Sequence, residues 1–352
     1  MANSSFQIAT KPKLFVSYPL WQYANGALDE YATAYGSCSD EDMIKLLQID
    51  PSNQVNLKPA NGSFFDSLKY KLVPSYDNET NLVDSGLWNF DFCMLLGHNL
   101  NTQASMFFIK SAGDASEQLI ESSNIVNGDT NSTPLYDGWS LFSIDSTPRE
   151  SDRFFTIEFW DSLSENLDCN LGSILWGTSY SFPQNVQLNT STKFEYGVKQ
   201  KSTISGKTIS TANWTKPNNW ITEPFGLTSE GQEGDNFQRR SGRRVWNMSF
   251  DSLAPDKVMP QNMMMNDNGY TPQDNHTQGA TENSSLYNIN NSPDFYSAVV
   301  HKTMGGHLPM VLQIDSSDNS PSGFAICRMS SYTVTQKSPL LFSYSITLTE
   351  QI

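Results

Sequence analysis

Apolar and polar residues alternate with a period of two along much of this chain, which is the pattern of half-buried β-strands. The clearest examples are Phe154 to Trp160, Arg244 to Phe250 and Phe342 to Leu348. Further strand-like runs lie at Leu87 to Leu96, Ser105 to Ile109, Trp139 to Ile144, Ser173 to Trp176, Phe194 to Val198, Leu308 to Ile314 and Phe324 to Arg328. Most spacers are rich in Gly, Asn, Ser and Asp, so we expect short antiparallel strands joined by polar turns.

This pattern predicts a mainly β protein of two domains. We expect an antiparallel β-sandwich over residues 53–178, preceded by an N-terminal arm with a short helix over residues 1–52. Residues 179–352 should form a β-barrel or sandwich domain with one packed α-helix. A polar segment over residues 261–291 is long enough to predict a functional or mobile loop.

Two segments carry the signals of short helices. Ser39 is a candidate N-cap, and acidic residues follow it where the helix dipole favours anions. Met43, Leu46 and Leu47 give this segment an apolar stripe. Further along, Ser292 is the candidate cap of a second helix, which Gly305-Gly306 should terminate.

The N-terminal segment combines a short strand signal, Leu14 to Tyr18, with Pro19 and two aromatic residues, Trp21 and Tyr23. An exposed aromatic arm is typical of an assembly device. The other interpretation is that the arm packs on its own domain. The sequence leaves both open.

A basic cluster precedes the strand that begins near Val245. Arg239, Arg240, Arg243 and Arg244 flank Ser241-Gly242, and the face of Trp246, Met248 and Phe250 should hold this turn at a fixed place. Because Arg pairs well with carboxylates at interfaces, the cluster is the strongest interface candidate. The alternative is a solvated hairpin tip.

The only apolar stretch in the long polar segment is Met263, Met264 and Met265. It is either an adaptable contact surface or the anchor of its own loop. The stretch Ser202 to Thr211, rich in Gly, Ser and Thr, is typical of a hairpin tip.

Composition narrows the classes of partner. The 352 residues include 22 Lys and Arg against 37 Asp and Glu, a formal net charge of -15. Phosphate binding needs a basic face, so nucleic acid is not expected as a partner. A 12% aromatic content is too high for a disordered chain. The basic cluster therefore suits an acidic protein surface.

The four cysteines, Cys38, Cys93, Cys169 and Cys327, are widely separated and form no CxxC pair, so we expect them to be reduced. The N-terminus lacks the apolar stretch of a signal peptide. No apolar run has membrane-spanning length, and we expect synthesis in the cytoplasm without membrane insertion.

The sequence gives only weak evidence for a catalytic or metal-binding site. Cys93 and His98 are five residues apart and should point to opposite faces of a strand, and Glu158 and Asp161 should do the same. His301 and His307 lack a third metal ligand at suitable spacing, even if Asp315 is counted. The run from Asp315 to Asn319 lacks the acidic ladder of a calcium loop and favours a polar turn. We therefore expect no enzymatic activity, no cofactor and no metal.

Six segments carry a resemblance to a known family. They are Leu95-Leu96-Gly97-His98-Asn99, Tyr136-Asp137-Gly138, Phe154 to Phe159, Trp176-Gly177, Arg240 to Phe250, and Phe324-Ala325-Ile326-Cys327-Arg328. Together they resemble an uncharacterised family of virion structural proteins of tailed bacteriophages. The resemblance covers the chain from about residue 85 to the C-terminus, and its most specific parts are Gly242 to Phe250 and Gly305 to Arg328.

The resemblance implies a tail or baseplate subunit located in the virion. The first domain is similar to galactose-binding-like sandwiches, and the second to the barrel-plus-helix units of tail-tube and distal-tail proteins. The expected partners are other copies of the chain in a ring and neighbouring tail proteins. The alternative is a carbohydrate-binding virion protein that touches a host surface glycan through residues 53–178.

Overall fold

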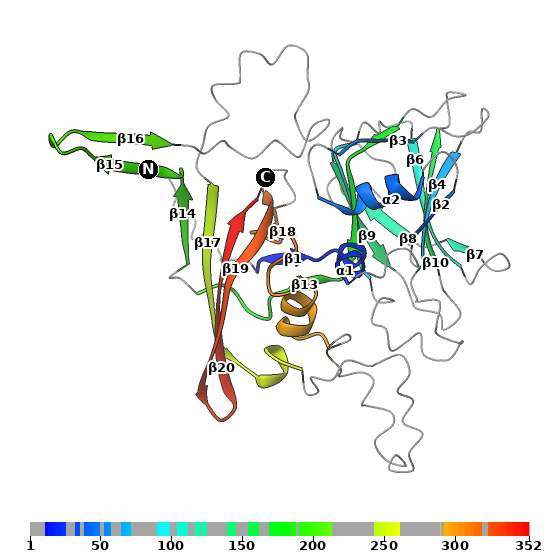
Figure 1. The fold of residues 1–352 in the computed structure, drawn as a ribbon. Coiled ribbons are helices and arrows are strands. Elements are labelled where there is room, and N and C mark those ends of the chain that lie inside the picture. The colour runs from blue at the N-terminus through cyan, green and yellow to red at the C-terminus, as the bar shows by residue number, and fades with distance from the viewer. Residues whose placement is uncertain are drawn as a thin grey trace, which may run out of the picture.

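A computed structural model gives the fold, which is mainly β and built from antiparallel sheets (Figure 1). Every pair of strands that the described residues form is antiparallel. The structure describes residues 11–25, 32–35, 39–49, 53–57, 65–71, 90–98, 104–111, 117–119, 121–124, 139–145, 154–161, 169–187, 190–212, 243–260, 289, 292–318 and 323–351.

The expected sandwich consists of a five-stranded and a four-stranded sheet. Aromatic side chains pack between them: the ring of Phe155 lies 5.4 Å from that of Trp176 and 4.7 Å from that of Phe90. The five-stranded sheet has the order β2 (Ala32–Tyr35), β4 (Phe65–Lys71), β10 (Phe154–Asp161), β6 (Ala104–Ser111) and β7 (Glu117–Leu119). The four-stranded sheet has the order β12 (Ser173–Gly177), β5 (Phe92–Leu96), β9 (Trp139–Asp145) and β8 (Glu121–Asn124), and β3 (Val55–Leu57) pairs with β11 (Cys169–Leu171) beside them.

The second domain is organised around a seven-stranded sheet. Its long central strands β17, β19 and β20 follow the alternation that the sequence predicts, with Trp246, Met248 and Phe250 buried on one face. The order is β13 (Ser179–Ser181), β1 (Lys13–Phe15), β18 (Met310–Gln313), β19 (Phe324–Ser338), β20 (Leu341–Glu350), β17 (Arg243–Leu253) and β14 (Ser191–Glu195).

Residues 11–25 do not form a free arm. Strand β1 lies inside the seven-stranded sheet, where Leu14 pairs with Tyr180 of β13 and with Leu312 of β18. The side chains of Leu14 and Phe15 are buried. The sequence left open whether this segment is an exposed arm or packs on its own domain, and the structure shows it packed. Its strand belongs to the sheet of the C-terminal domain.

Helix α1 (Tyr18–Ala24) follows directly and was not expected. Pro19 fits the first turn of this helix, where the missing N–H of a proline is not needed. Ser17 caps the helix by accepting a hydrogen bond from the backbone N–H of Leu20. Helix α2 (Asp40–Leu47) confirms the predicted cap: Ser39 and Asp42 form a reciprocal capping box.

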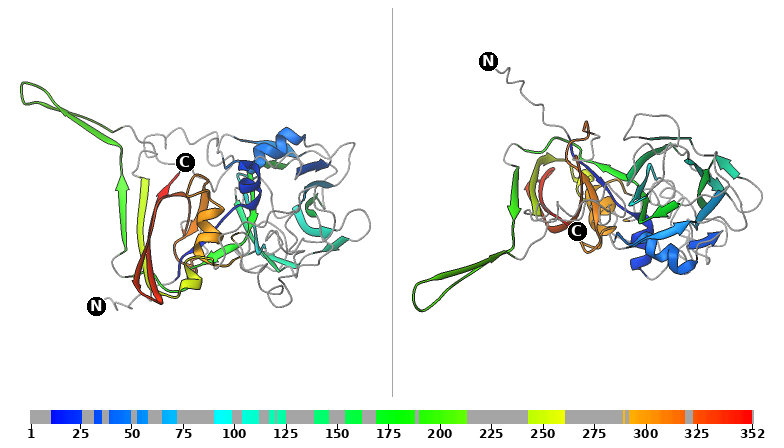
Figure 2. Two further views of the ribbon diagram at one scale, coloured as in Figure 1. Left: turned by 60° about the horizontal axis from the view of Figure 1, so that its bottom comes forward. Right: turned by 90° about the horizontal axis from the view of Figure 1, so that it is seen from above.

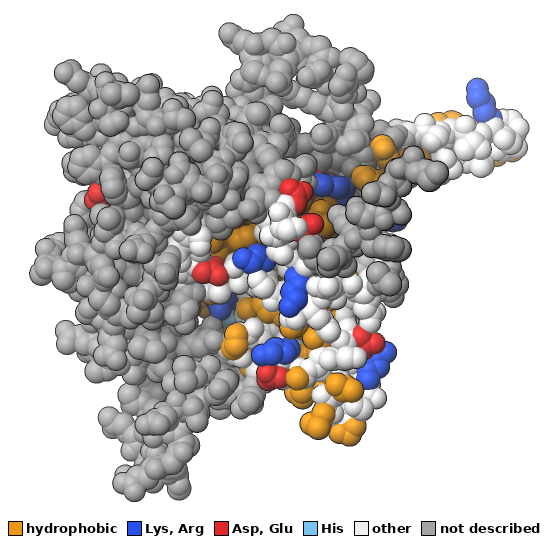
Figure 3. All heavy atoms as spheres, turned by 180° about the vertical axis from the view of Figure 1, so that it is seen from behind, with side chains coloured by type: hydrophobic (Ala, Val, Ile, Leu, Met, Phe, Trp, Pro, Cys, Tyr) orange, Lys and Arg blue, Asp and Glu red, His pale blue; other side chains and the backbone are white. Residues whose placement is uncertain are grey.

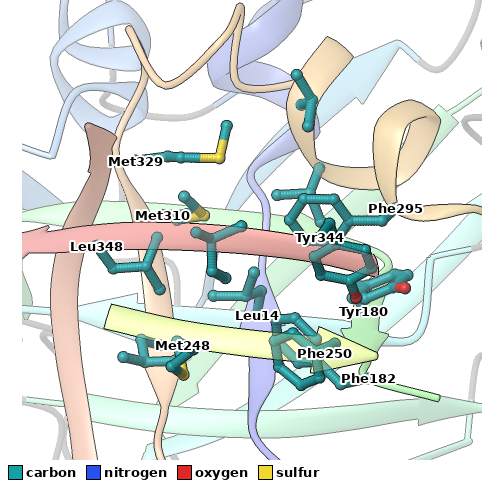
Figure 4. Packing of buried hydrophobic residues seen from close by; sticks show 14 of the residues in the cluster. Leu14, Tyr180, Phe182, Met248, Phe250, Phe295, Met310, Met329, Tyr344 and Leu348 are labelled. Carbon is teal, nitrogen blue, oxygen red and sulfur yellow. The ribbon is translucent and has the colours of Figure 1, made fainter. Parts of the chain in front are cut away.

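The packed helix of the second domain is a π-helix, Tyr296–His301, and not the α-helix that was expected. Ser292 does not cap it; instead the carboxylate of Asp294 accepts a hydrogen bond from the N–H of Ser297 at 2.9 Å. The curved sheet wraps around this helix (Figure 2). Figure 4 shows Phe295 stacked on Tyr344 in the core between them, with ring centroids 4.7 Å apart.

The two domains share a second core. Phe15, Val311 and Phe324 belong to the seven-stranded sheet and pack in one cluster with Phe92 and Leu175 of the four-stranded sheet. Strands β1 and β18 are thus buried on both faces, because alternate residues enter the helix-covered core and this shared core. The division at residue 178 is therefore bridged by packed apolar side chains.

One element leaves the body of the molecule. Strands β15 (Val198–Ser202) and β16 (Thr208–Ala212) form a two-stranded hairpin that projects away from the seven-stranded sheet (Figures 1 and 2). This confirms the hairpin predicted at Ser202 to Thr211. A short 3-10 helix, Pro255–Lys257, follows β17. No helix among the described residues is long and apolar enough to cross a membrane.

Candidate interaction surface

Two residues of the arginine cluster, Arg243 and Arg244, are described, and they do not form the projecting turn that the sequence predicts. Arg244 lies within β17, and its guanidinium donates to the carboxylate of Glu350 on β20 at 2.7 and 3.1 Å. The guanidinium also stacks on Trp246, 5.0 Å from the ring centroid, and its side chain is 28% exposed. The charge of Arg244 is therefore satisfied within the sheet, and its role at an interface with another subunit stays a prediction.

Arg243 is half-buried at the start of β17, where the register places it opposite Glu195 of β14. Cross-strand neighbours of opposite charge favour this pairing of strands. Arg239 and Arg240 lie outside the described residues, as do Met263, Met264 and Met265. The interface role of these five residues therefore stays a prediction.

The aromatic residues of α1 have partners within the chain. The ring of Trp21 meets the ring of His301 at 5.6 Å, edge-on, and so joins α1 to the π-helix. Tyr23 is 36% exposed, and its hydroxyl accepts a hydrogen bond from the side-chain amide of Gln48 at 3.5 Å. Trp21 thus packs within the chain and Tyr23 lies at the surface, and the interface role of both stays a prediction.

A different surface has the properties of an interface. All five residues of β14 are exposed, and so are both strands of the hairpin wherever their side chains are described. Phe194, Tyr196 and Val198 are 57, 49 and 53% exposed, and Ile204 and Ile209 are still more open to solvent. We call residues 198–212 the ribbon and residues 191–212 the exposed arm.

The ribbon has a built turn. The N–H of Thr203 donates to the carbonyl of Lys207 at 2.8 Å, and the Thr203 hydroxyl donates to the same oxygen at 2.9 Å. Gly206 takes a positive φ of 78°, which an L residue rarely adopts. The geometry of the tip is therefore fixed by its own hydrogen bonds, although the ribbon is a separate two-stranded sheet that no described element covers.

Sequence reasoning located the hairpin but missed its exposure. Alternation at Phe194, Tyr196 and Val198 is read as a half-buried strand, because apolar residues at every second position normally face a core. The stretch that follows carries a signal of this exposure. Lys199, Lys201 and Lys207 lie there among Ser and Thr, with only isolated apolar residues.

The possible nucleophiles are enclosed. Cys93 is fully buried on β5, and burial raises the pKa of its thiol, so the thiolate needed for nucleophilic attack is disfavoured. Cys327 is likewise buried, and both are free thiols, as expected. The Nε2 atom of His98 lies 3.0 Å from the Ser140 hydroxyl, a pair that the sequence did not suggest. His98 and Ser140 are 0 and 1% exposed, so this pair is enclosed within the fold.

The remaining candidate catalytic and metal-binding residues lie in ordinary turns, strands and packing contacts. Asp315 accepts hydrogen bonds from the backbone and hydroxyl of Ser317, which confirms the polar turn. Glu158 and Asp161 both belong to β10, and the side chain of Asp161 lies outside the described part of the chain. Burial lowers the pKa of His301, which packs on Trp21. Within the part of the chain that the structure describes, no three His, Cys, Asp or Glu side chains gather to hold a metal.

The chain matches no protein-family model and no curated protein sequence. The exposed arm is consequently the feature on which a functional assignment has to be built.

Proposed function

We propose that this chain is a non-enzymatic structural subunit of a tailed-phage virion, a ring or adaptor subunit of the tail or baseplate. The observation that carries the proposal is the ribbon of β15 and β16, which stands away from the molecule and is exposed along its length. A two-stranded hairpin without a core is marginally stable in water. A neighbouring protein surface supplies the missing contacts.

The neighbouring elements support an assembly role. β14 is hydrogen-bonded to β17 on one side, and its other edge pairs with no strand among the described residues. An open edge beside exposed Phe194 and Tyr196 is the arrangement to which a further strand or an apolar surface adds. Soluble monomers seldom leave such an edge and such side chains together.

The phage assignment rests on the resemblance of the segments from residue 85 onward to virion structural proteins. The carbohydrate-binding alternative needs exposed aromatic rings on the sandwich domain. Phe90, Phe92, Phe142, Phe155 and Trp176 all lie buried among its described residues. These rings give the alternative no support, so the structural role is the one that we propose.

The test compares the full chain with a variant in which residues 198–212 are replaced by Gly-Gly. Val198 and Ala212 are opposite each other in the ladder, so a short link closes the gap without strain on β14. We expect the wild type to form a closed oligomer by light scattering and a ring by negative-stain microscopy, and the variant to be a folded monomer. A wild type that stays monomeric at all concentrations refutes the proposal.

The matched control is the double variant Leu340→Ser, Leu341→Ser at the turn between β19 and β20. These two leucines are 72 and 44% exposed and lie outside the exposed arm. The control should retain the wild-type oligomer. An antibody against the chain should also label the tail end of virions that contain it; labelling of host material alone contradicts the virion assignment.

A further inference from the structure

The ribbon has two chemically different faces. Residues directly opposite each other in an antiparallel ladder lie on the same face, and successive residues alternate between faces. The ladder pairs Lys199 with Thr211 and Lys201 with Ile209, so these four share one face. Lys207 immediately precedes Thr208 and falls on that same face by alternation. The opposite face carries Val198, Gln200, Ser202, Thr208 and Ser210, none of them charged.

All three lysines of the ribbon thus lie on one face together with Ile209, and the ribbon contains no Asp or Glu. The projecting hairpin in Figure 3 accordingly shows basic and hydrophobic side chains and no acidic ones. Because the whole chain has a net charge of -15 and the ribbon contributes +3, the remaining residues carry -18. The ribbon is therefore a basic projection from a strongly acidic body.

We infer that the lysine face of the ribbon docks on the acidic surface of a second copy of this chain. Copies with a net charge of -15 repel one another, and an oligomer needs basic groups placed where they reach the neighbour's acidic surface. Lys199, Lys201 and Lys207 are all exposed and stand on a hairpin that extends beyond the described body of the molecule. Arg244 does not fill this role, because it is bound to Glu350.

Ile209 gives the same face an apolar contact. At 58% exposure it leaves most of its side chain in water, between the positions of Lys207 and Thr211. An apolar residue bordered by lysines fits a protein surface with acidic groups around a hydrophobic spot. The inference rests on the proposed function, since it names the partner and the face that a self-assembling subunit would use.

The experiment uses two triple variants of the full chain that change net charge equally. Lys199→Gln, Lys201→Gln and Lys207→Gln remove three positive charges from the lysine face. Gln200→Glu, Ser202→Glu and Ser210→Glu add three negative charges to the opposite face. Both make the net charge three units more negative, and circular dichroism with thermal melting checks that both retain the wild-type fold.

We expect the lysine variant to weaken self-association about tenfold or more, measured by sedimentation equilibrium, and the opposite-face variant to change it much less. Wild-type association should also weaken with salt, whereas the lysine variant should lose most of this salt dependence. Equal weakening of the two variants would assign the effect to overall charge and overturn the inference, as would no weakening of either.

Further outcomes separate this inference from the proposed function. If the wild type assembles and the lysine variant assembles equally well, the docking face is wrong while the structural role stands. If the wild type is monomeric throughout, the proposed function fails first. Binding of the monomer to anionic vesicles or to duplex DNA, abolished by the lysine variant, would replace a second copy with a different partner and also overturn the inference.

Discussion

The ring of Phe15 meets the ring of Phe92 edge-on, with ring centroids 5.0 Å apart. Phe15 belongs to β1 in the seven-stranded sheet, and Phe92 begins β5 in the sandwich. The preceding residue, Leu14, points the other way and enters the helix-covered core with Phe250 and Tyr344. A strand of three residues from near the N-terminus therefore fills two cores at once.

We expect Phe15→Ala to lower the free energy of unfolding by about 3–5 kcal/mol. Removal of the ring leaves a cavity between two packed sheets, which the surrounding side chains fill only in part. Urea denaturation followed by fluorescence measures this. Tyr23→Ala on the exposed side of α1 is the control and should cost under about 1 kcal/mol. If Phe15→Ala costs no more than the control, the two domains are not joined through a shared core.

The ion pair between Arg244 and Glu350 supports a second prediction. Glu350 accepts hydrogen bonds from both the guanidinium and the backbone N–H of Arg244, the latter at 3.0 Å, and its side chain is 13% exposed. Glu350→Gln should cost about 1.5–3 kcal/mol, because charge-assisted hydrogen bonds in partly buried sites are stronger than exposed ones.

A double-mutant cycle of Arg244→Met with Glu350→Gln should show a coupling free energy above about 1 kcal/mol. The comparison pair is Lys193 and Glu195, whose charged atoms are 2.8 Å apart but whose side chains are 67 and 45% exposed. Its coupling should be under about 1 kcal/mol. Additive effects of the two substitutions would show that Arg244 and Glu350 do not stabilise each other, and that Arg244 behaves as an exposed surface charge.

Local patterns in the sequence predicted much of this fold. The alternation at Trp246, Met248 and Phe250 gave the correct buried face, because these three side chains pack into one hydrophobic core. The Ser39 cap was found because capping needs only residues a few positions apart. The helix that begins at Tyr296 ends at His301, before the predicted stop at Gly305-Gly306, where both residues take a positive φ.

Contacts between distant residues could not be predicted in the same way. Nothing local to Leu14 indicates that its strand pairs with residues near 180 and 312. The partner of Arg244 is 106 positions away, so an arginine-rich stretch gave the impression of a free basic turn. The alternation around Phe194 indicated a strand correctly, but whether a core covers that strand depends on the rest of the fold.

Lys302 supports a prediction of pH dependence. Its ammonium group is 4.9 Å from the ring centroid of Tyr18, and burial lowers its pKa to about 8, although Asp294 partly opposes the shift. In the unfolded chain the pKa returns to its usual value near 10.4. Between these two values the unfolded state binds more protons than the folded state, so stability rises with pH in this window.

The measurement is the difference in free energy of unfolding between wild type and Lys302→Met from pH 7 to 9.5. This difference should shift in favour of the wild type above pH 8, by at most about 1.4 kcal/mol per pH unit. The upper limit avoids the tyrosines, since burial raises the pKa of Tyr18 and Tyr344 and their titration acts in the opposite direction. A difference that is independent of pH would mean that Lys302 is solvated in the folded protein.

The two adjacent glycines after the π-helix should respond very differently to alanine. Both take a positive φ, 69° at Gly305 and 94° at Gly306, so each substitution carries the strain of a left-handed L residue, about 1–2 kcal/mol. A Cβ on Gly305 meets open space, whereas a Cβ on Gly306 overlaps the carbonyl oxygen of Met329 on β19.

Gly306→Ala should therefore cost about 3 kcal/mol or more, because overpacking against backbone adds to the strain and forces the turn away from the sheet. Gly305→Ala is the matched control, with the same chemical change at a residue that also has a positive φ. Thermal unfolding of the two variants gives the comparison. Equal melting temperatures would show that the turn does not lie against β19, because only the contact with Met329 distinguishes the two positions.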